Sequence, residues 1–298
     1  MRRLFPAAVC LFFSFPGAAV VTAQEPLKVQ AANYPLAYFA ERIATEAFEI
    51  EYLVDPDVDP AFWRPSDEAM IAFQQADIIL RNGATYSKWM HHASLPVSAI
   101  VDSSREFRED FIETEGELHT HGDGTVHSHG GIAFTTWLDF RQAAIQAEAI
   151  ARRFAAVKPA EAVSIQANLD SLMSDLSELD SGMKALGARI GSTPLLASHP
   201  IYQYMSRAYG LNVESLEWEP EMIMTDDSLA DFAELQSSHE ASWMIWEASP
   251  SPENVTALAA QGVRGMVIDP CANRPEEGDW LAVMKQNLVN LSAVAQEE

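Results

Sequence analysis

The sequence predicts an α/β fold in which two parallel-sheet lobes are joined by one long helix. Three observations lead to this prediction. Strand and helix signals alternate between residues 27 and 104, and they alternate again between residues 193 and 295. Such alternation is typical of parallel sheets covered by helices. Between the two regions, residues 159–188 carry one apolar stripe at helical spacing, which predicts a single long helix.

The first alternating region begins at Leu27 with the strand-like segment LKVQAA. Ser66 is a suitable N-cap, and Asp67 and Glu68 suit the positive end of the helix that follows it. The segment DPDVDP, rich in Pro and Asp, indicates a loop. The expected strands are 27–32, 48–54, 77–83 and 98–104, and the expected helices are 35–44 and 67–75.

Periodicity is weak between Arg105 and Ala133, and an irregular segment of this length is usually functional or disordered. A helix is expected over 135–156, and a second begins near Pro159, a favourable first-turn residue. The apolar stripe of this second helix could also pair two chains in a coiled coil, although it spans only three to four heptads. Its members are Ile165, Leu169, Leu172, Leu176, Leu179, Met183 and Leu186.

The second alternating region begins with the strand TPLLAS. A helix should follow from Pro200 to Tyr209 and end at Gly210, and RGMVID should form a buried strand. The expected strands are 193–198, 213–218, 243–247 and 264–269, and the expected helices are 200–209, 226–236, 252–260 and 279–295.

The N-terminus and the composition indicate an exported protein. Arg2 and Arg3 precede an apolar run that ends in VTA, so residues 1–23 resemble a secretory signal peptide cleaved after Ala23. A retained membrane anchor is the alternative. Cys271 is the only cysteine beyond this segment, so no internal disulfide can form. The net charge of −24 disfavours nucleic acid and anionic lipid as partners and attracts cations.

The segment HTHGDGTVHSHGG, residues 119–131, holds four of the eight histidines of the chain. Imidazole binds late first-row metals, and nearby carboxylates add charge. His127 and His129 are one residue apart, and Gly130 and Gly131 would let the backbone turn so that both reach one ion. We therefore expect this loop to contact metal. Additional capture of metal is expected from His119, His121 and Asp123.

Two further candidate ligands follow strands of the second region. Ligands of open α/β sheets gather beyond the carboxyl ends of the strands. His199 follows TPLLAS, and Asp269 ends RGMVID. One imidazole and one carboxylate suit Zn²⁺ or a similar divalent ion. Each residue also has a purely structural alternative, since His199 could hydrogen-bond locally at a helix start and Asp269 could cap a turn before Pro270.

The remaining histidines, His91, His92 and His239, are expected at the surface, and the tryptophans in the core or lining a cleft. Enzyme motifs are few. HTHGD matches the H-x-H-x-D opening of metallo-β-lactamase-type hydrolases, but Gly124 stands where those enzymes have a further histidine. A metal-dependent hydrolase and a metal-scavenging or adhesive surface protein therefore remain alternatives to a binding protein.

The chain resembles the zinc- and manganese-specific solute-binding proteins of bacterial ABC transporters. Five blocks carry the resemblance in order: NYPLAYFAERIA, DPAFWRPSDEAMIAFQQADIILRNGATYSKWM, TTWLDF, SHPIYQYMSRAYGL and VRGMVIDP. The family also places a histidine-rich acidic loop before its WLD block. The resemblance implies two lobes joined by a rigid backbone helix, a metal in the cleft between them, and delivery of that metal to a membrane permease.

Family members commonly bind metal through three histidines and one carboxylate. The resemblance matches His199 to the third histidine and Asp269 to the carboxylate, but it places Ala61 and Thr135 at the other two positions. Phe140 also replaces the proline of the family's WLDP. We hypothesise that His129 and His127 complete the site with His199 and Asp269, and Asp59 is a further candidate ligand. A degenerate cleft with a weakly collecting loop is the competing hypothesis.

The expected organisation is a signal peptide (1–23), an N-terminal lobe (24–156) containing the acidic histidine-rich loop (113–131), a linking helix (159–188) and a C-terminal lobe (189–298). The expected cargo is Zn²⁺, with Mn²⁺ or another divalent cation as alternatives. The expected partner is an ABC permease, and the mature chain is expected to be a periplasmic monomer without enzymatic activity.

Overall fold

A computed structural model describes residues 25–114, 118–120, 126–128, 131–218 and 222–296. For 118–120, 126–128 and Asp226 it describes the backbone alone. The expected signal peptide lies outside the described residues. Within the described part of the chain, no helix combines the length and apolar character needed to cross a bilayer.

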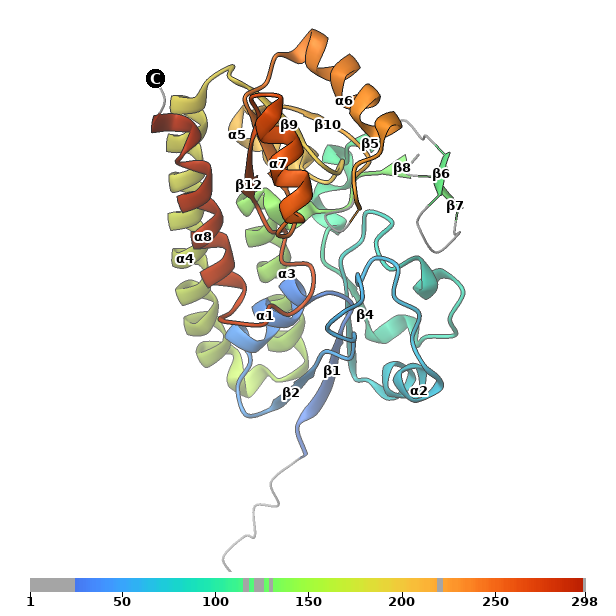
Figure 1. The fold of residues 1–298 in the computed structure, drawn as a ribbon. Coiled ribbons are helices and arrows are strands. Elements are labelled where there is room, and N and C mark those ends of the chain that lie inside the picture. The colour runs from blue at the N-terminus through green and yellow to red at the C-terminus, as the bar shows by residue number, and fades with distance from the viewer. Residues whose placement is uncertain (1–24, 115–117, 121–125, 129–130, 219–221, 297–298) are drawn as a thin grey trace, which may run out of the picture.

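The described chain contains two four-stranded sheets whose strands are all parallel (Figure 1). The N-terminal sheet has the strand order β2-β1-β3-β4, and the C-terminal sheet has the order β10-β9-β11-β12. The α/β fold class predicted from the sequence is therefore confirmed. The strands are β1 (Leu27–Ala31), β2 (Phe48–Glu51), β3 (Ile78–Arg81), β4 (Ile100–Asp102), β9 (Pro194–Ala197), β10 (Asn212–Ser215), β11 (Trp243–Trp246) and β12 (Arg264–Val267).

The helices follow the predicted order with small shifts at their ends. The Ser66 hydroxyl accepts the Ala69 N–H and caps α2, as expected from the sequence. Gly210 ends α5 with φ +67°, a conformation that glycine adopts without a steric penalty. The helices are α1 (Tyr34–Ile43), α2 (Asp67–Gln75), α3 (Phe140–Val157), α4 (Ala162–Ile190), α5 (Gln203–Tyr209), α6 (Asp226–His239), α7 (Pro252–Ala260) and α8 (Trp280–Leu291).

Helix α4 contacts elements of both halves of the molecule. It packs against α1 and α3 on the N-terminal side and against α5 and α8 on the C-terminal side, and Figure 1 shows α4 and α8 running side by side. All seven members of the predicted apolar stripe are buried. The stripe belongs to one continuous core that includes residues of both sheets, such as Val29 and Leu195. This packing within one chain accounts for the stripe without a coiled-coil partner.

The segment after β4, expected to be irregular, forms short antiparallel pairs. β5 (Glu113–Thr114) pairs with β8 (Gly131–Ile132), and β6 (Leu118–Thr120) pairs with β7 (Val126–Ser128). Short 3₁₀ turns flank this region at Arg105–Asp110 and Thr136–Leu138.

The halves are joined by polar contacts as well as by the core. The Asn273 side-chain amide lies 2.7 Å from the Asp55 carbonyl oxygen and 2.8 Å from that of Val58, and its Oδ1 accepts the Tyr52 hydroxyl at 2.9 Å. The Tyr34 amide donates to the carbonyl of Ala272 at 2.9 Å. The loop after β12 is therefore bonded to the N-terminal half.

One strand differs from its expected burial. RGMVID was expected to be buried, but Arg264 and Gly265 are exposed. β12 lies at the edge of its sheet, beside β11 alone. The guanidinium of Arg264 stacks over the Trp243 ring at 4.2 Å, which covers part of this edge.

Candidate functional site

His199 follows β9 by two residues, so the end of this strand fixes its position. Its side chain is only 9% exposed, and its Nδ1 lies 3.6 Å from Oε1 of Glu247. Glu247 directly follows β11, the strand next to β9. The structure thus brings an imidazole and a carboxylate together at the carboxyl edge of the C-terminal sheet.

Asp269 follows β12 by two residues and lies at the same edge. Its Oδ1 accepts the Cys271 amide at 2.6 Å, and Asn287 binds its backbone at both the N–H (3.0 Å) and the C=O (2.7 Å). Burial raises the pKa of the Asp269 carboxyl, and the Cys271 hydrogen bond acts in the opposite direction. Asp269 therefore fills the turn role that the sequence left open and also lies at the strand end where ligands gather.

The two positions that the resemblance would give to histidines are buried in the N-terminal half. Ala61 is 7% exposed, and its amide donates to Asp59 Oδ1 at 2.8 Å. Thr135 is 3% exposed, and its hydroxyl donates to the carbonyl oxygen of Ile201, two residues after His199. Thr135 thus forms a bond between the halves at a position that the resemblance would give to a ligand.

Two further bonds cross between the halves. Trp137 Nε1 donates to the carbonyl oxygen of Pro270 at 2.8 Å, immediately after Asp269. The Phe140 amide donates to the Tyr209 hydroxyl at 3.0 Å. Because proline has no N–H, the proline that the resemblance would place at position 140 could not make the second bond.

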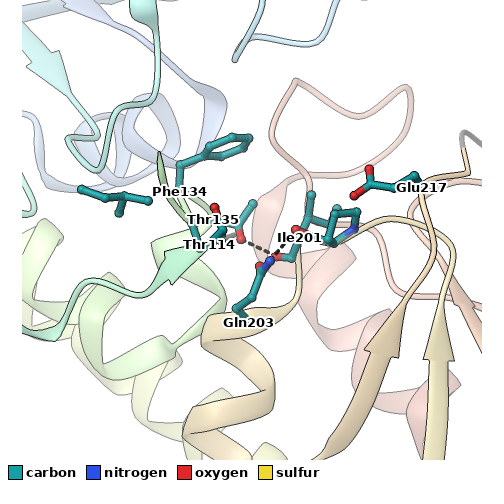
Figure 2. Close-up of a pocket in the computed structure, with 9 residues that line it drawn as sticks. Thr114, Phe134, Thr135, Ile201, Gln203 and Glu217 are labelled. Carbon is teal, nitrogen blue, oxygen red and sulfur yellow. Dashed lines mark hydrogen bonds between the residues drawn. The ribbon is translucent and has the colours of Figure 1, made fainter. Parts of the chain in front are cut away.

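A small pocket of about 70 Å³ lies between the halves beside Thr135. Figure 2 shows Phe134 and Thr135 approaching Ile201 and Gln203 from the other half, with Glu217 farther to one side. The Gln203 amide donates to the Pro200 carbonyl at 2.6 Å. Thr114 and Ile132 also line the pocket, and they belong to β5 and β8, from which the histidine-rich segment extends.

The histidine-rich segment is described only in part. His119 and His127 are paired across β6 and β7 in the backbone register. His121, Asp123 and His129 lie outside the described residues, as does most of the HTHGD sequence that resembles a hydrolase motif. Among the described residues, no group of three or more His, Cys, Asp or Glu side chains lies close enough together to hold a metal ion.

The other histidines separate into two kinds. His91 and His92 are exposed, as predicted. His239 was expected at the surface, and this was wrong: it is 7% exposed, and its Nε2 lies 2.9 Å from the Leu195 carbonyl oxygen. His239 is the last residue of α6, and its side chain packs against β9 instead of lying in solvent.

Two carboxylates at the carboxyl edge of the C-terminal sheet were not among the candidate ligands predicted from the sequence. Glu247 follows β11 by one residue, and Glu217 follows β10 by two. The rule that selected His199 and Asp269, a polar side chain just beyond the carboxyl end of a parallel strand, applies equally to both. Applied to all four expected strands, it would have identified Glu247, which ends WMIWE, but not Glu217, which lies inside the expected strand 213–218.

The chain is similar to known proteins over most of its length. Residues 29–294 match the family model described as zinc-uptake complex component A, periplasmic. The zinc-binding lipoprotein AdcA of Streptococcus pneumoniae is 20% identical over 99% of this chain, which spans 61% of AdcA. The manganese ABC transporter substrate-binding lipoprotein PsaA of Streptococcus anginosus is 25% identical over 74% of each chain.

The fold has a counterpart among solved structures. The metal-dependent lipoprotein YcdH of Bacillus subtilis superimposes with a TM-score of 0.76 at 19% identity, covering 91% of this chain and 98% of YcdH. The parallel sheets, the contacts between the halves and a family match over nearly the whole described chain agree with one another. The chain belongs to the family of zinc-uptake complex component A, periplasmic.

Proposed function

We propose that the chain is an extracytoplasmic solute-binding protein that captures a divalent cation and delivers it to an ABC permease. The proposed cation is Zn²⁺. The observation that carries this proposal is the placement of His199 and Asp269 at one edge of the C-terminal sheet. The N-terminal half contacts the chain beside both residues, at Ile201 and Pro270. The names of AdcA and PsaA, which refer to zinc and manganese, support a metal as the cargo.

The proposed ligands are His199, Asp269, His127 and His129. The need for ligands from the loop follows from the N-terminal half, because Ala61 offers no side-chain donor and the Thr135 hydroxyl is already bonded to Ile201. Three imidazoles with one carboxylate form a tetrahedral shell that suits Zn²⁺.

The remaining loop residues have a secondary role in this proposal. His119, His121 and Asp123 provide additional capture of metal ions by the loop. Asp59, whose Oδ1 accepts the Ala61 amide, is an additional candidate ligand. The short β5–β8 pair anchors the loop beside the pocket between the halves.

A ligand from a loop links metal binding to ordering of that loop. The conformational entropy lost on ordering lowers the affinity below that of a site whose ligands are already in place. Affinity should also fall as pH drops through the imidazole range, because a protonated imidazole cannot bind a cation.

The remaining parts of the proposal concern organisation. We infer a periplasmic mature chain cleaved near Ala23, active as a monomer, with lobes at 24–156 and 189–298 joined by a helix at 159–188. The proposed role involves no chemistry on the cargo. A carrier can close the coordination shell of its metal, whereas a hydrolase must keep one position open for water.

Calorimetric titration of the metal-stripped protein with Zn²⁺ tests the proposal. The variants are His199→Ala and the double variant His127→Ala/His129→Ala. The matched control is His91→Ala/His92→Ala, which also removes two imidazoles, but from exposed positions at a 3₁₀ turn of the N-terminal half. We expect one tight site in the wild type and in the control, and its loss in both test variants.

A different pattern would contradict the proposal. If His199→Ala binds Zn²⁺ like the wild type and only weak, multiple binding to the loop is seen, the sheet edge is not a zinc site. If the control loses as much affinity as the loop variant, the number of imidazoles matters and their position does not.

A further inference from the structure

The order of the C-terminal strands places a third candidate ligand between the two already proposed. His199 follows β9 and Asp269 follows β12, and these strands are not neighbours, because β11 lies between them. Neighbouring strands are about 4.8 Å apart, so β9 and β12 are separated by about 10 Å. A cation held by both side chains must therefore lie over the end of β11, where the next residue is Glu247.

The strand register places His199 and Glu247 at the same level. Ala197 of β9 is paired with Ile245 of β11, and extending this pairing by two residues sets His199 opposite Glu247. Their side chains converge, with His199 Nδ1 3.6 Å from Glu247 Oε1. Two ligands of a tetrahedral Zn²⁺, each bound at 2.0–2.1 Å, lie about 3.4 Å apart. The observed separation is thus close to that of two atoms sharing one ion.

The Tyr202 side chain lies near the carboxylates of both Glu247 and Asp269. Its hydroxyl donates to the carbonyl oxygen of Ile268, so the side chain reaches from the loop after β9 to the end of β12. Burial raises the pKa of Tyr202 well above its ordinary value, and the charges of Glu247 and Asp269 raise it further. Both carboxylates therefore lie near this hydroxyl.

We propose that Glu247 is a direct ligand of the cation, the third that the C-terminal sheet supplies beside His199 and Asp269. This inference rests on the proposed function. The three side chains do not yet converge on one point, and Asp269 Oδ1 is bonded to the Cys271 amide. Binding thus requires rotation of the Asp269 side chain, which exchanges that hydrogen bond for the metal.

A ligand at Glu247 changes how many donors must come from outside the C-terminal sheet. Three ligands from one sheet leave a single position of a tetrahedral shell, which one further imidazole can fill. Two nitrogens and two oxygens make a harder donor set than three nitrogens and one oxygen, and carboxylates suit Mn²⁺. The site should therefore discriminate less strongly between Zn²⁺ and Mn²⁺ than a three-histidine site.

Titration of the metal-stripped full chain with Zn²⁺ and Mn²⁺ tests this assignment through two substitutions. Glu247→Gln should weaken Zn²⁺ binding by more than about 100-fold, beyond the 10–100-fold typical of groups that only orient a ligand. Glu247→His replaces one ligand by another, so Zn²⁺ affinity should return to within about tenfold of the wild type. The same variant should bind Mn²⁺ more weakly, so the preference for Zn²⁺ increases.

The control is Glu253→Gln, which removes the same charge from an exposed position at the start of α7. It should bind both metals as the wild type does. Thermal unfolding of each stripped variant verifies that it is folded.

Three results would overturn the assignment. They are Zn²⁺ affinity of Glu247→Gln within about threefold of the wild type, equal losses in Glu247→Gln and Glu247→His, and a loss in Glu253→Gln as large as in Glu247→Gln. Equal losses at Glu247 would mean that this residue orients His199 and does not bind metal. The proposed function fails separately, if His199→Ala leaves Zn²⁺ binding unchanged.

Discussion

Replacing Gly187 with alanine should destabilise the protein, although alanine is the better helix former. Gly187 is buried in α4, where the helix passes the last residue of α5. A Cβ atom at this position would lie 2.1 Å from the carbonyl oxygen of Tyr209. That atom belongs to the backbone, so it cannot move without moving α5.

The magnitude follows from two opposing effects. Alanine gains about 1 kcal/mol over glycine in a helix interior. Separating the Cβ from the Tyr209 oxygen requires a shift of about 1 Å between α4 and α5, and overpacking of this kind costs about 3 kcal/mol. The expected net loss is about 2 kcal/mol. For a chain of this size, it corresponds to a fall in Tm of roughly 4–6 °C.

Gly182 provides a matched control in the same helix. A Cβ there would meet the Cδ2 atom of Leu288 at 2.5 Å, which is the end of a flexible side chain and can rotate away. Gly182→Ala should therefore be close to neutral. Thermal and urea unfolding of both metal-stripped variants, followed by circular dichroism, measures the difference. Equal or greater stability of Gly187→Ala than of Gly182→Ala would refute the argument from close packing.

Three further predictions concern the pH dependence, the core and the cargo. Burial acts to raise the pKa of Asp102, but hydrogen bonds from Arg108 and Arg81 outweigh it and lower the pKa below 3.8. Ionised Asp102 therefore stabilises the fold above pH 4, and this stabilisation is lost as pH falls through the lowered pKa. Asp102→Asn should cost about 2 kcal/mol at pH 7 and much less at pH 3, as measured by urea unfolding; an equal cost at both pH values would contradict this. Leu172→Ala, at a fully buried position of α4, should cost about 3 kcal/mol in the same assay, whereas Val163→Ala, 84% exposed on the same helix, should change stability by less than about 0.5 kcal/mol. Zn²⁺ at about 100 times its Kd should add about 2.7 kcal/mol and raise Tm by roughly 5–10 °C, and a chelator should reverse this; an unchanged Tm would argue against a site in the folded state.

The sequence predicts the order and type of the main elements because local periodicity reports local structure. The stripe from Ile165 to Leu186 is the clearest case, since a seven-member 3.6-residue pattern fits a helix and no strand. Burial of individual residues is less predictable. The position of Arg264 in an edge strand depends on strand order, and that of His239 against β9 depends on helix packing, and both are properties of the whole fold.

The residues of the candidate site could also be predicted only in part. His199 and Asp269 could be found because strand ends are visible in the sequence. The proximity of His199 to Glu247 could not be predicted from the sequence, because it depends on β11 lying between β9 and β12. That order arises from the crossovers of the chain, and no local pattern around WMIWE contains it.

The bonding of Asn273 has a kinetic consequence if the chain releases a cargo as proposed above. Its amide and carbonyl groups join the loop after β12 to Tyr52, Asp55 and Val58 in the other half. When the halves separate, water can replace each partner, so the net loss is only about 1 kcal/mol per bond. The contacts do break together, because they converge on one side chain. Under the proposed function, the residence time of the cargo depends in part on an asparagine that is not itself a proposed ligand, and exchange rates could change there while the coordination of the metal stays the same.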